Sequence, residues 1–225
     1  MLHEGKQPEI PYLCGVSGFL FFEKSKDNLK ISKMEDQMKK LAVFFPGIGY
    51  TADKPLMYFS RRIAAAHGFY ILIMDYKGFP PKIMGDRGRM EQSFRIAQEQ
   101  AEDKLSGTDL CDYDDIVFIG KSIGTAVAAK IASESPARDR IRMVLYTPLE
   151  ETFAFDFGDA IAFTGDADPW VGKEKSRICG ICESRGIPCS LIPHANHSLE
   201  SGDIFTDMKE LYEIMQETER FIERR

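Results

Sequence analysis

The chain has 225 residues, of which 44% are hydrophobic and 28% are charged, and its formal net charge is −6. This is the composition of an ordinary globular protein, and a chain of this length can bury enough surface to fold without disulfide or metal support. The negative charge argues against a nucleic-acid-binding protein, because affinity for phosphate backbones comes mainly from clustered Lys and Arg side chains.

The predicted elements alternate between strands and helices along most of the chain. In chain order, the predicted strands are Gly15–Phe22, Asn28–Lys33, Leu41–Phe45, Tyr70–Met74, Ile116–Ile119, Met143–Tyr146, Ala160–Phe163 and Ser190–Ile192. The predicted helices are Pro55–His67, Arg89–Leu105, Ile123–Ser133, Lys173–Arg185 and Ile204–Arg224. The first two strands form an antiparallel start. The later alternation predicts an α/β fold with a mostly parallel twisted sheet of about eight strands and helices on both faces. We expect a single domain over residues 1–225, because no linker is long enough to split it.

No segment of the sequence has the character of a membrane span, which needs about 20 apolar residues. The apolar run Gly15–Phe22 is short and meets Glu23, so it is interpreted as a strand and not as a secretory leader. We therefore expect a cytoplasmic protein with no membrane partner.

The cysteines are Cys14, Cys111, Cys179, Cys182 and Cys189. Cys179 and Cys182 form a Cys-x-x-Cys pair that is followed by His194 and His197, so a zinc site has to be considered. The pair lies in a predicted helix, where residues three apart simply share one face, and the sequence has no second pair of this kind. The pattern favours reduced cysteines and no bound metal.

The most informative segment joins a buried strand to a helix. The apolar run Ile116–Ile119 ends at Gly120, and Ser122 and Gly124 follow before a helix rich in small residues. A Gly-x-Ser-x-Gly pattern in this strand–turn–helix context is typical of a nucleophile elbow. Glycines are needed there because a strand that turns at once into a helix leaves no room for a Cβ beside the turn. Ser122 would then stand at the tip of the turn, next to the free N–H groups of the new helix.

Two other interpretations apply to the same residues. Gly120, Lys121 and Ser122 resemble the end of a phosphate-binding loop, but Asp115 stands where that motif needs glycine. A tight turn with an idle serine is the other interpretation, since glycine and serine are common in turns. A serine becomes a nucleophile only when a base, itself oriented by an acid, lies beside it.

Candidates for both partners follow later strands, in the chain order serine, acid, histidine. Asp166 and Asp168 follow one predicted strand, and His194 and His197 follow the next one. An acid and a histidine in these loops would converge on the same edge of the sheet as Ser122.

These features together resemble the α/β-hydrolase superfamily, in particular its small lid-less bacterial hydrolases of the dienelactone-hydrolase and serine-esterase type. The resemblance covers nearly the full length of the chain. The segments that carry it are Phe45–Gly49, Asp75–Gly78, Gly120–Gly124, Gly165–Val171 and Ala195–Ser198. It implies Ser122 as the nucleophile, Asp168 as the acid and His197 as the base. It also implies that the backbone N–H groups of Ile123 and Ile48 hold the oxyanion.

The acid has rivals. The family spacing Gly-x-x-Asp favours Asp168 over Asp166, and the segment Pro169–Val171 matches what usually follows that acid. Glu150 and Glu151 end an earlier strand, where some relatives place the acid, so they stay open as alternatives.

The base and the second oxyanion donor also have rivals. The Asn-His-Ser context favours His197 over His194. Many relatives have His-Gly just before the position of Ile48, where this chain has Pro-Gly, so Gly49 is an alternative donor.

The surroundings of this site are expected to be open. Only residues 148–159 separate the two strands between which relatives that act on long lipids insert a lid, so no substantial lid is expected. The aromatic residues expected to line a shallow apolar cleft are Tyr50, Tyr76, Phe79 and Trp170. Phe153 and Phe155 are equally well explained as cleft or as core residues. Lys121 is expected to face solvent, and a preference for acidic substrates is its alternative role.

The resemblance implies a serine hydrolase that cleaves small or medium carboxylic esters or thioesters through an acyl-enzyme intermediate. It would act on a small-molecule acyl substrate and need no metal or organic cofactor. A peptidase or acyltransferase with the same triad is an alternative, because the fold does not choose the substrate. A non-catalytic relative that binds a ligand or a protein is another. The acyl group, the leaving group and the oligomeric state stay open.

Overall fold

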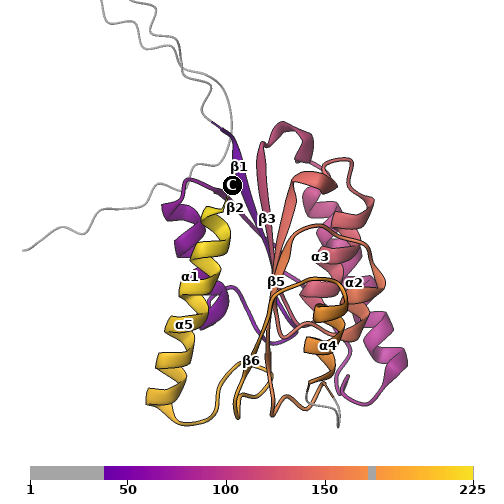
Figure 1. Ribbon diagram of the computed structural model, residues 1–225. Coiled ribbons are helices and arrows are strands. Elements are labelled where there is room, and N and C mark those ends of the chain that lie inside the picture. Colours follow the sequence, from indigo (N-terminus) through magenta and orange to yellow (C-terminus); the bar gives the residue numbers. More distant parts are fainter. Residues whose placement is uncertain (1–37, 172–175, 225) are drawn as a thin grey trace, which may run out of the picture. The chain divides into compact units, whose positions relative to one another are not determined.

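The computed structural model describes residues 38–171 and 176–224, which form a parallel sheet between two layers of helices (Figure 1). The described strands are β1 (Lys40–Phe45), β2 (Tyr70–Ile73), β3 (Asp115–Lys121), β4 (Ile141–Tyr146), β5 (Ala160–Gly165) and β6 (Cys189–Ile192). Within the described residues they form one six-stranded sheet in the order β2-β1-β3-β4-β5-β6, and each neighbouring pair is parallel. The predicted α/β class is confirmed. The two earlier predicted strands, Gly15–Phe22 and Asn28–Lys33, and the residue Cys14 lie outside the described residues.

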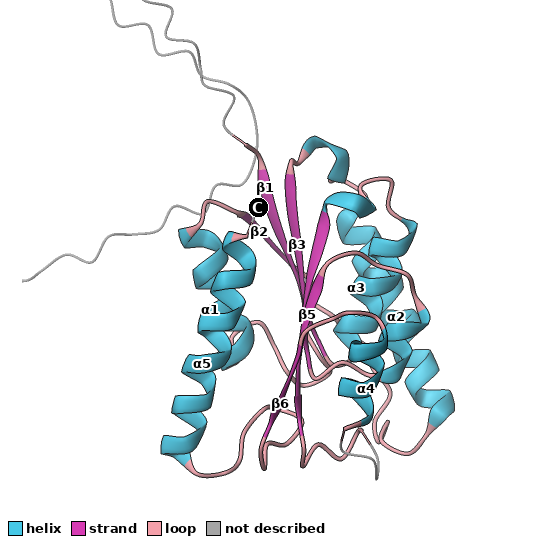
Figure 2. Ribbon diagram, in the orientation of Figure 1, coloured by secondary structure: helices cyan, strands magenta, loops and turns pink. Residues whose placement is uncertain are grey.

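The helices of the described residues lie on both faces of the sheet. They are α1 (Pro55–Ala66), α2 (Arg87–Leu105), α3 (Ile123–Glu134), α4 (Arg177–Ser184) and α5 (Ile204–Glu223). α1 and α5 cover one face, and α2, α3 and α4 cover the other (Figure 2). Pro55 begins α1, and Gly68 follows its end with a φ of 80°. The side chains of Asp86 and Asp203 cap the first turns of α2 and α5.

The central strand β3 is buried along its whole length. Successive side chains of a strand point to opposite faces. Ile116 and Phe118 accordingly pack in the cluster beneath α2 and α3, and Val117 and Ile119 pack in the cluster beneath α1 and α5. The same alternation assigns Lys121, two residues beyond Ile119, to the face that α1 and α5 cover.

The order of the strands creates a switch point at the carboxyl edge of the sheet. β2 lies on one side of β1, and β3 lies on the other side. In open sheets of this kind, ligands bind outside the carboxyl ends of the strands at such a point. The register pairs Phe45, the last residue of β1, with Gly120 of β3. The segments that follow these two residues therefore meet at the same edge.

The connection between β4 and β5 contains one short 3-10 helix, η3 (Glu150–Ala154), and no lid is inserted there. None of the helices in the described ranges combines the length and hydrophobicity that crossing a bilayer would require. These ranges belong to one compact unit, Gln37–Arg225. A single domain over residues 1–225 stays a prediction.

Candidate active site

Ser122 stands on a strained turn between β3 and α3. Its φ of 55° and ψ of −126° lie outside the regions that side-chain-bearing residues favour. A Cβ on Gly124 would come within 2.0 Å of the Phe45 carbonyl oxygen, and a Cβ on Gly120 within 2.7 Å of the Thr125 Cα. Both positions therefore need glycine, as the motif predicts. α3 begins at the next residue after Ser122, so its first N–H groups lie beside the serine.

Three side chains that are distant in sequence form a continuous hydrogen-bond chain at this turn. The Nε2 atom of His197 lies 2.7 Å from the Ser122 Oγ, and its Nδ1 atom lies 2.7 Å from the Asp168 Oδ2. When the Nδ1–H donates to the carboxylate, Nε2 is left as the acceptor that the serine hydroxyl needs. The arrangement matches a nucleophile, a base and an orienting acid in geometry.

The carboxylate of this hydrogen-bond chain, Asp168, is buried and fixed by a second hydrogen bond. Asp168 is 5% exposed, and its Oδ1 accepts a hydrogen bond from the Trp170 backbone N–H at 2.9 Å. His197 is more accessible, with 20% of its side chain exposed. A buried acid behind a partly exposed imidazole leaves the reactive end of the chain open to a substrate.

Close backbone contacts hold the acid loop and the histidine loop together. A Cβ on Gly165, which ends β5, would lie 2.1 Å from the Ala195 carbonyl oxygen. Thr147, which follows β4 with a φ of 42°, donates from its hydroxyl to the His197 carbonyl oxygen at 3.2 Å. Sequence reasoning did not identify Thr147 as part of the site. It used Gly165 only as the glycine of the Gly-x-x-Asp spacing and did not predict its close approach to the histidine loop.

The rival residues lie in other contacts. The Asp166 Oδ1 accepts a hydrogen bond from the His194 backbone N–H at 2.6 Å, so these two residues brace the loops. Glu150 pairs with Arg177 at 2.6 Å. Glu151 is exposed on η3. The hydrogen-bond chain to Ser122 thus contains Asp168 and His197 and none of these alternatives.

Two backbone N–H groups near Ser122 have no acceptor among the described residues. Ile123 is the first residue of α3, and Ile48 lies in the turn after β1 that the Tyr50 N–H to Gly47 O bond closes at 3.2 Å. A Cβ on Gly47 would lie 3.2 Å from the Ser122 Cβ, so this turn packs directly against the elbow. The geometry brings both expected oxyanion donors to the neighbourhood of the nucleophile.

No family model matches the sequence, and no curated protein matches it either. Many solved structures are nevertheless similar to it. The predicted CIB-like hydrolase of Thermoplasma acidophilum has a TM-score of 0.57 at 14% identity, over 82% of this chain and 88% of that one. The esterase Pf2001 of Pyrococcus furiosus has a TM-score of 0.51 at 14% identity, over 82% and 84%. An alpha-beta serine hydrolase homologue from Coxiella burnetii has a TM-score of 0.50 at 17% identity, over 82% of this chain and 86% of that one.

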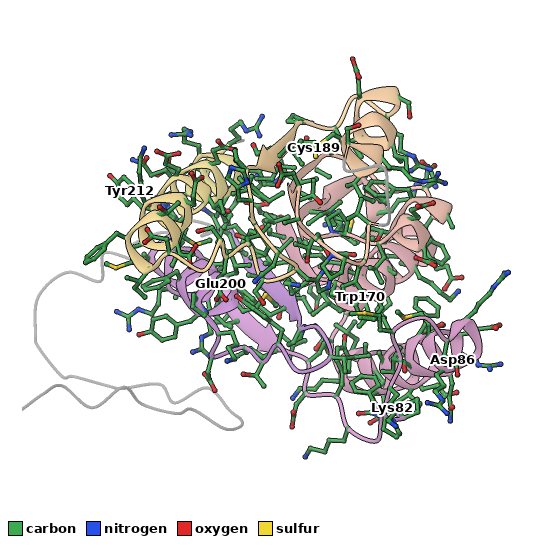
Figure 3. The ribbon with its side chains drawn as sticks, turned by 90° about the horizontal axis from the view of Figure 1, so that it is seen from below. Lys82, Asp86, Trp170, Cys189, Glu200 and Tyr212 are labelled. Carbon is green, nitrogen blue, oxygen red and sulfur yellow. The ribbon has the colours of Figure 1, made fainter. Side chains whose placement is uncertain are left out.

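The chain has an α/β-hydrolase fold. The hydrogen-bond chain of Ser122, His197 and Asp168 lies at the carboxyl edge of the sheet. Figure 3 views the molecule from the side of this edge. Trp170 and Glu200 are both labelled on this edge, with Glu200 nearer to α5. The Trp170 ring lies 5.5 Å from the His197 ring, at an angle of 37°. Trp170 therefore covers one side of the imidazole.

The environment of His197 favours its neutral form. Burial lowers the pKa of His197 below its usual value of 6.5. The hydrogen bond to Asp168 opposes this effect, and repulsion from Lys121 adds to it. A neutral imidazole is the form that can accept a proton from Ser122.

Lys121 does not face solvent, and this expectation from the sequence was wrong. Its side chain is 1% exposed and lies over the Tyr50 ring, with the Nζ 5.0 Å from the ring centroid. Burial lowers the pKa of Lys121 from 10.5 to about 7, and the charges of Asp168 and Glu200 only partly oppose this. The alternation of β3 assigns Lys121 to the covered face of the sheet, so the sequence did contain a signal for its burial.

A cavity of about 310 Å³ opens beside the elbow. Its apolar lining residues are Met90, Phe94, Ile123, Ala126, Leu149, Ala154 and Phe155, and its charged ones are Arg87, Glu91 and Glu151. It lies between α2, α3 and η3, and Ile123, the residue after Ser122, is part of its wall. This size is at the lower end of the range for small-molecule sites.

The aromatic residues expected to line the cleft have different surroundings. Tyr50 is buried beneath Lys121 and borders a second cavity of about 300 Å³, with Leu199 and Glu200. Tyr76 and Phe79 pack edge to face, with their ring centroids 6.0 Å apart, against the core beneath α2 and α3. The fourth, Trp170, is the one beside His197.

Of the two phenylalanines with open roles, Phe153 is buried in the core, whereas Phe155 lines the cavity and stacks on Phe94 at 6.2 Å. Sequence reasoning did not identify Phe94, because the contact between α2 and η3 joins distant segments.

The cysteines and histidines considered for zinc are not gathered at one point. The Cys179 Sγ on α4 lies 2.9 Å from the Cys189 Sγ, whereas the His197 side chain is within hydrogen-bond distance of Ser122. Within the described residues, one group of potential metal ligands lies within 4.8 Å of one another, and it consists of His67, Glu219 and Glu223. These residues are near the C-terminal ends of α1 and α5, at the edge of the sheet away from the elbow.

Proposed function

We propose that this protein is a serine hydrolase that cleaves small or medium carboxylic esters or thioesters through an acyl-enzyme intermediate. The observation that supports it most is the unbroken hydrogen-bond chain from Ser122 through His197 to Asp168. The strained backbone of Ser122 is a second support, because strain at a turn is typical of functional sites. The proposal includes a single domain that acts in the cytoplasm without a metal or organic cofactor.

In this mechanism His197 moves the protons. Ser122 attacks the substrate carbonyl carbon while Nε2 of His197 takes the hydroxyl proton. Asp168 holds the imidazole in the right tautomer and stabilises the imidazolium without taking the proton itself. The imidazolium then donates the proton to the leaving alkoxide or thiolate. A water molecule repeats these steps, and the acid product and free serine are released.

The negative charge that develops on the carbonyl oxygen would be held by the N–H groups of Ile123 and Ile48. Such donors stabilise the transition state because they are fixed before the reaction starts, and one donor is worth about 2.7–4 kcal/mol in a comparable site. The positive end of the α3 dipole acts in the same direction. Neither N–H donates to a protein acceptor in the described part of the chain, which supports this role.

The cavity beside Ile123 supports a small or medium acyl group. Its apolar walls suit an acyl chain, and its volume of about 310 Å³ limits the length of that chain. Peptidase and acyltransferase activity use the same residues, so the substrate panel has to include amides and alternative acceptors. A module that only binds a ligand is less well supported, because the imidazole faces the serine at hydrogen-bond distance.

A fluorophosphonate probe tests the proposal directly. The probe phosphonylates activated serines, so the wild-type protein should be labelled and Ser122→Ala should not. Ser198→Ala is the matched control, because Ser198 is a nearby serine outside the hydrogen-bond chain, and its labelling should equal that of the wild type. Labelling is measured by intact-mass spectrometry. A folded wild-type protein that stays unlabelled would favour the binding module instead.

A further inference from the structure

Lys121 is a buried cation that the mechanism above does not use. It is the last residue of β3, directly before Ser122, and it is 1% exposed. The Cβ that Gly47 lacks would lie 3.5 Å from the Lys121 Cγ, so the turn after β1 closes over its side chain. Lysine is rarely buried to this degree without a partner for its charge.

The ammonium group has neighbours but no direct partner in the described ranges 38–171 and 176–224. Its Nζ lies 5.0 Å from the centroid of the Tyr50 ring, a distance at which a cation is attracted to the ring face. Among the residues that the structure describes, no acceptor takes a hydrogen bond from Nζ and no carboxylate lies within 4.0 Å of it. A buried charge held only by a ring and by more distant carboxylates is expensive, and such groups cluster at functional sites.

Three of the segments at this edge present a titratable group to Lys121. Tyr50 comes from the segment after β1, Asp168 from the loop after β5, and His197 and Glu200 from the loop after β6. Burial raises the pKa of Tyr50 to about 12, so its ring stays neutral at physiological pH. The groups that can change charge near Lys121 in the neutral range are therefore His197 and Lys121 itself.

A neighbouring strand adds one more group. Tyr146 of β4 pairs in register with Lys121. Its hydroxyl lies 2.8 Å from the Ser60 Oγ and 2.6 Å from the Thr218 Oγ1. Burial raises its pKa, so Tyr146 is also neutral. The electrostatic coupling at this edge is thus between one ammonium and one imidazole, with Asp168 and Glu200 as counter-charges.

We propose that Lys121 is a positioning residue of the nucleophilic site, whose buried ammonium acts through His197 to keep the imidazole in its neutral, proton-accepting form. This inference rests on the proposed hydrolase function. Two positive charges at this edge repel each other, so a charged Lys121 makes protonation of His197 less favourable. Asp168 alone would have the opposite effect, since a buried carboxylate favours the imidazolium. The balance between Asp168 and Lys121 keeps His197 ready to take the proton of Ser122.

Lys121→Met tests this role, because methionine has a similar length and shape but no charge. Long-range ¹H–¹⁵N NMR spectra of the full-length protein follow each imidazole through a pH titration, and His197→Gln assigns the signal of His197. Loss of the like charge should move the titration of His197 to higher pH. Lys209→Met, which removes an exposed lysine on α5, is the matched control and should leave the titration unchanged.

The labelling rate provides a second measurement that a structural role would not move. In Lys121→Met the acid limb of the pH–rate profile should move to higher pH, because a larger fraction of the His197 imidazole is protonated at a given pH. A variant that only loosened the site would be slower at every pH. Lys121→Gln repeats both measurements with a neutral polar side chain, in case Lys121→Met does not fold.

The outcomes separate this inference from the proposed function. A wild-type protein that is not labelled would overturn the hydrolase proposal, while the NMR titration would still decide the coupling. A His197 titration that stays in place or moves to lower pH, in both Lys121 variants, would overturn the role of Lys121. That result would leave the hydrolase proposal intact if labelling of Ser122 persists.

Discussion

At the scale of single residues, the site depends on how one carboxylate is presented to His197. Asp168 reaches the Nδ1 of His197 at 2.7 Å, and its other oxygen is fixed by the Trp170 N–H. Asp166 lies two residues earlier but points its carboxylate at the His194 N–H. The two acids therefore have separate roles, one orienting the imidazole and one joining two loops.

Substitution of each acid by asparagine should separate these roles. Asp168→Asn should lower the labelling rate of Ser122 by about 10⁴-fold, because the amide favours the wrong imidazole tautomer. Asp166→Asn keeps an oxygen that can accept from the His194 N–H, so its rate should change by less than about tenfold. Both rates are measured with the fluorophosphonate probe at neutral pH. The reverse order of effects would mean that Asp166 is the acid.

The burial of Lys121 also predicts how the free energy of unfolding depends on pH. Its pKa in the folded protein, about 7, is lower than the unfolded value of 10.5. Between these values the unfolded chain binds more protons, so the contribution of Lys121 to the free energy of unfolding rises with pH. The destabilisation is fully present below about pH 7 and is lost as the pH approaches 10.5.

Lys121→Met removes this destabilisation. We expect the variant to be more stable than the wild type by an amount on the order of a few kcal/mol at pH 6, with a smaller difference at higher pH. Chemical denaturation at several pH values measures this difference. A stability difference that does not depend on pH would show that Lys121 is not desolvated as the structure indicates.

At the scale of elements, the site is assembled by close approaches of backbone. Gly124 brings α3 against the end of β1, and Gly165 brings the end of β5 against the histidine loop. Neither glycine has a positive φ, so the requirement is space and not backbone conformation. The same small residues thus fix both the fold and the distance between the acid and the base.

Gly165→Ala tests this link between packing and chemistry. The new Cβ would meet the Ala195 carbonyl oxygen, so the histidine loop must move away from the acid loop. We expect a loss of stability of about 1–3 kcal/mol or more, together with a lower labelling rate of Ser122. Gly107→Ala is the matched control, because no atom lies within 4 Å of the added Cβ. Equal stability and labelling in both variants would contradict this assembly.

At the scale of the whole molecule, the parallel sheet gathers the site at its carboxyl edge. The turn that contains Ile48 follows β1, Ser122 follows β3, Asp168 follows β5 and His197 follows β6. Their chain order and their position after strands predicted that an acid and a histidine would meet Ser122 at this edge, and the family resemblance selected Asp168 and His197 among the candidates. The Gly-x-Ser-x-Gly motif could be recognised from local sequence alone, because a strand–turn–helix junction is formed by residues that are close in sequence.

The surroundings of the site could not be predicted in the same way. Tyr50 and Tyr76 are buried or packed on the core, and the cavity beside Ile123 is lined by residues of α2 and η3 instead. Which helix lies against which loop depends on long-range packing that has no local sequence signal. Lys121 is an intermediate case, since the strand alternation indicates its burial while its charge suggests exposure.

The cavity predicts a preference for short acyl chains. Ala154→Trp would fill part of its mouth, because Ala154 lines the cavity and is exposed. The ratio of kcat/KM for p-nitrophenyl hexanoate over acetate should fall by about tenfold, which corresponds to about 1.4 kcal/mol of lost binding. Ala65→Trp on the exposed face of α1 is the control. An unchanged ratio in Ala154→Trp would place the acyl chain elsewhere, for example in the cavity beside Leu199.

The most direct test of the central claim is to trap the covalent intermediate. The protein is mixed with a p-nitrophenyl ester, quenched in acid within the first turnovers, and examined by intact-mass and peptide mass spectrometry. We predict an acyl group on Ser122 in the wild type, together with a burst of p-nitrophenol, and neither in His197→Ala on the same time scale. Ester cleavage without any acyl adduct on Ser122, or with the adduct on another residue, would contradict a nucleophilic role for this serine.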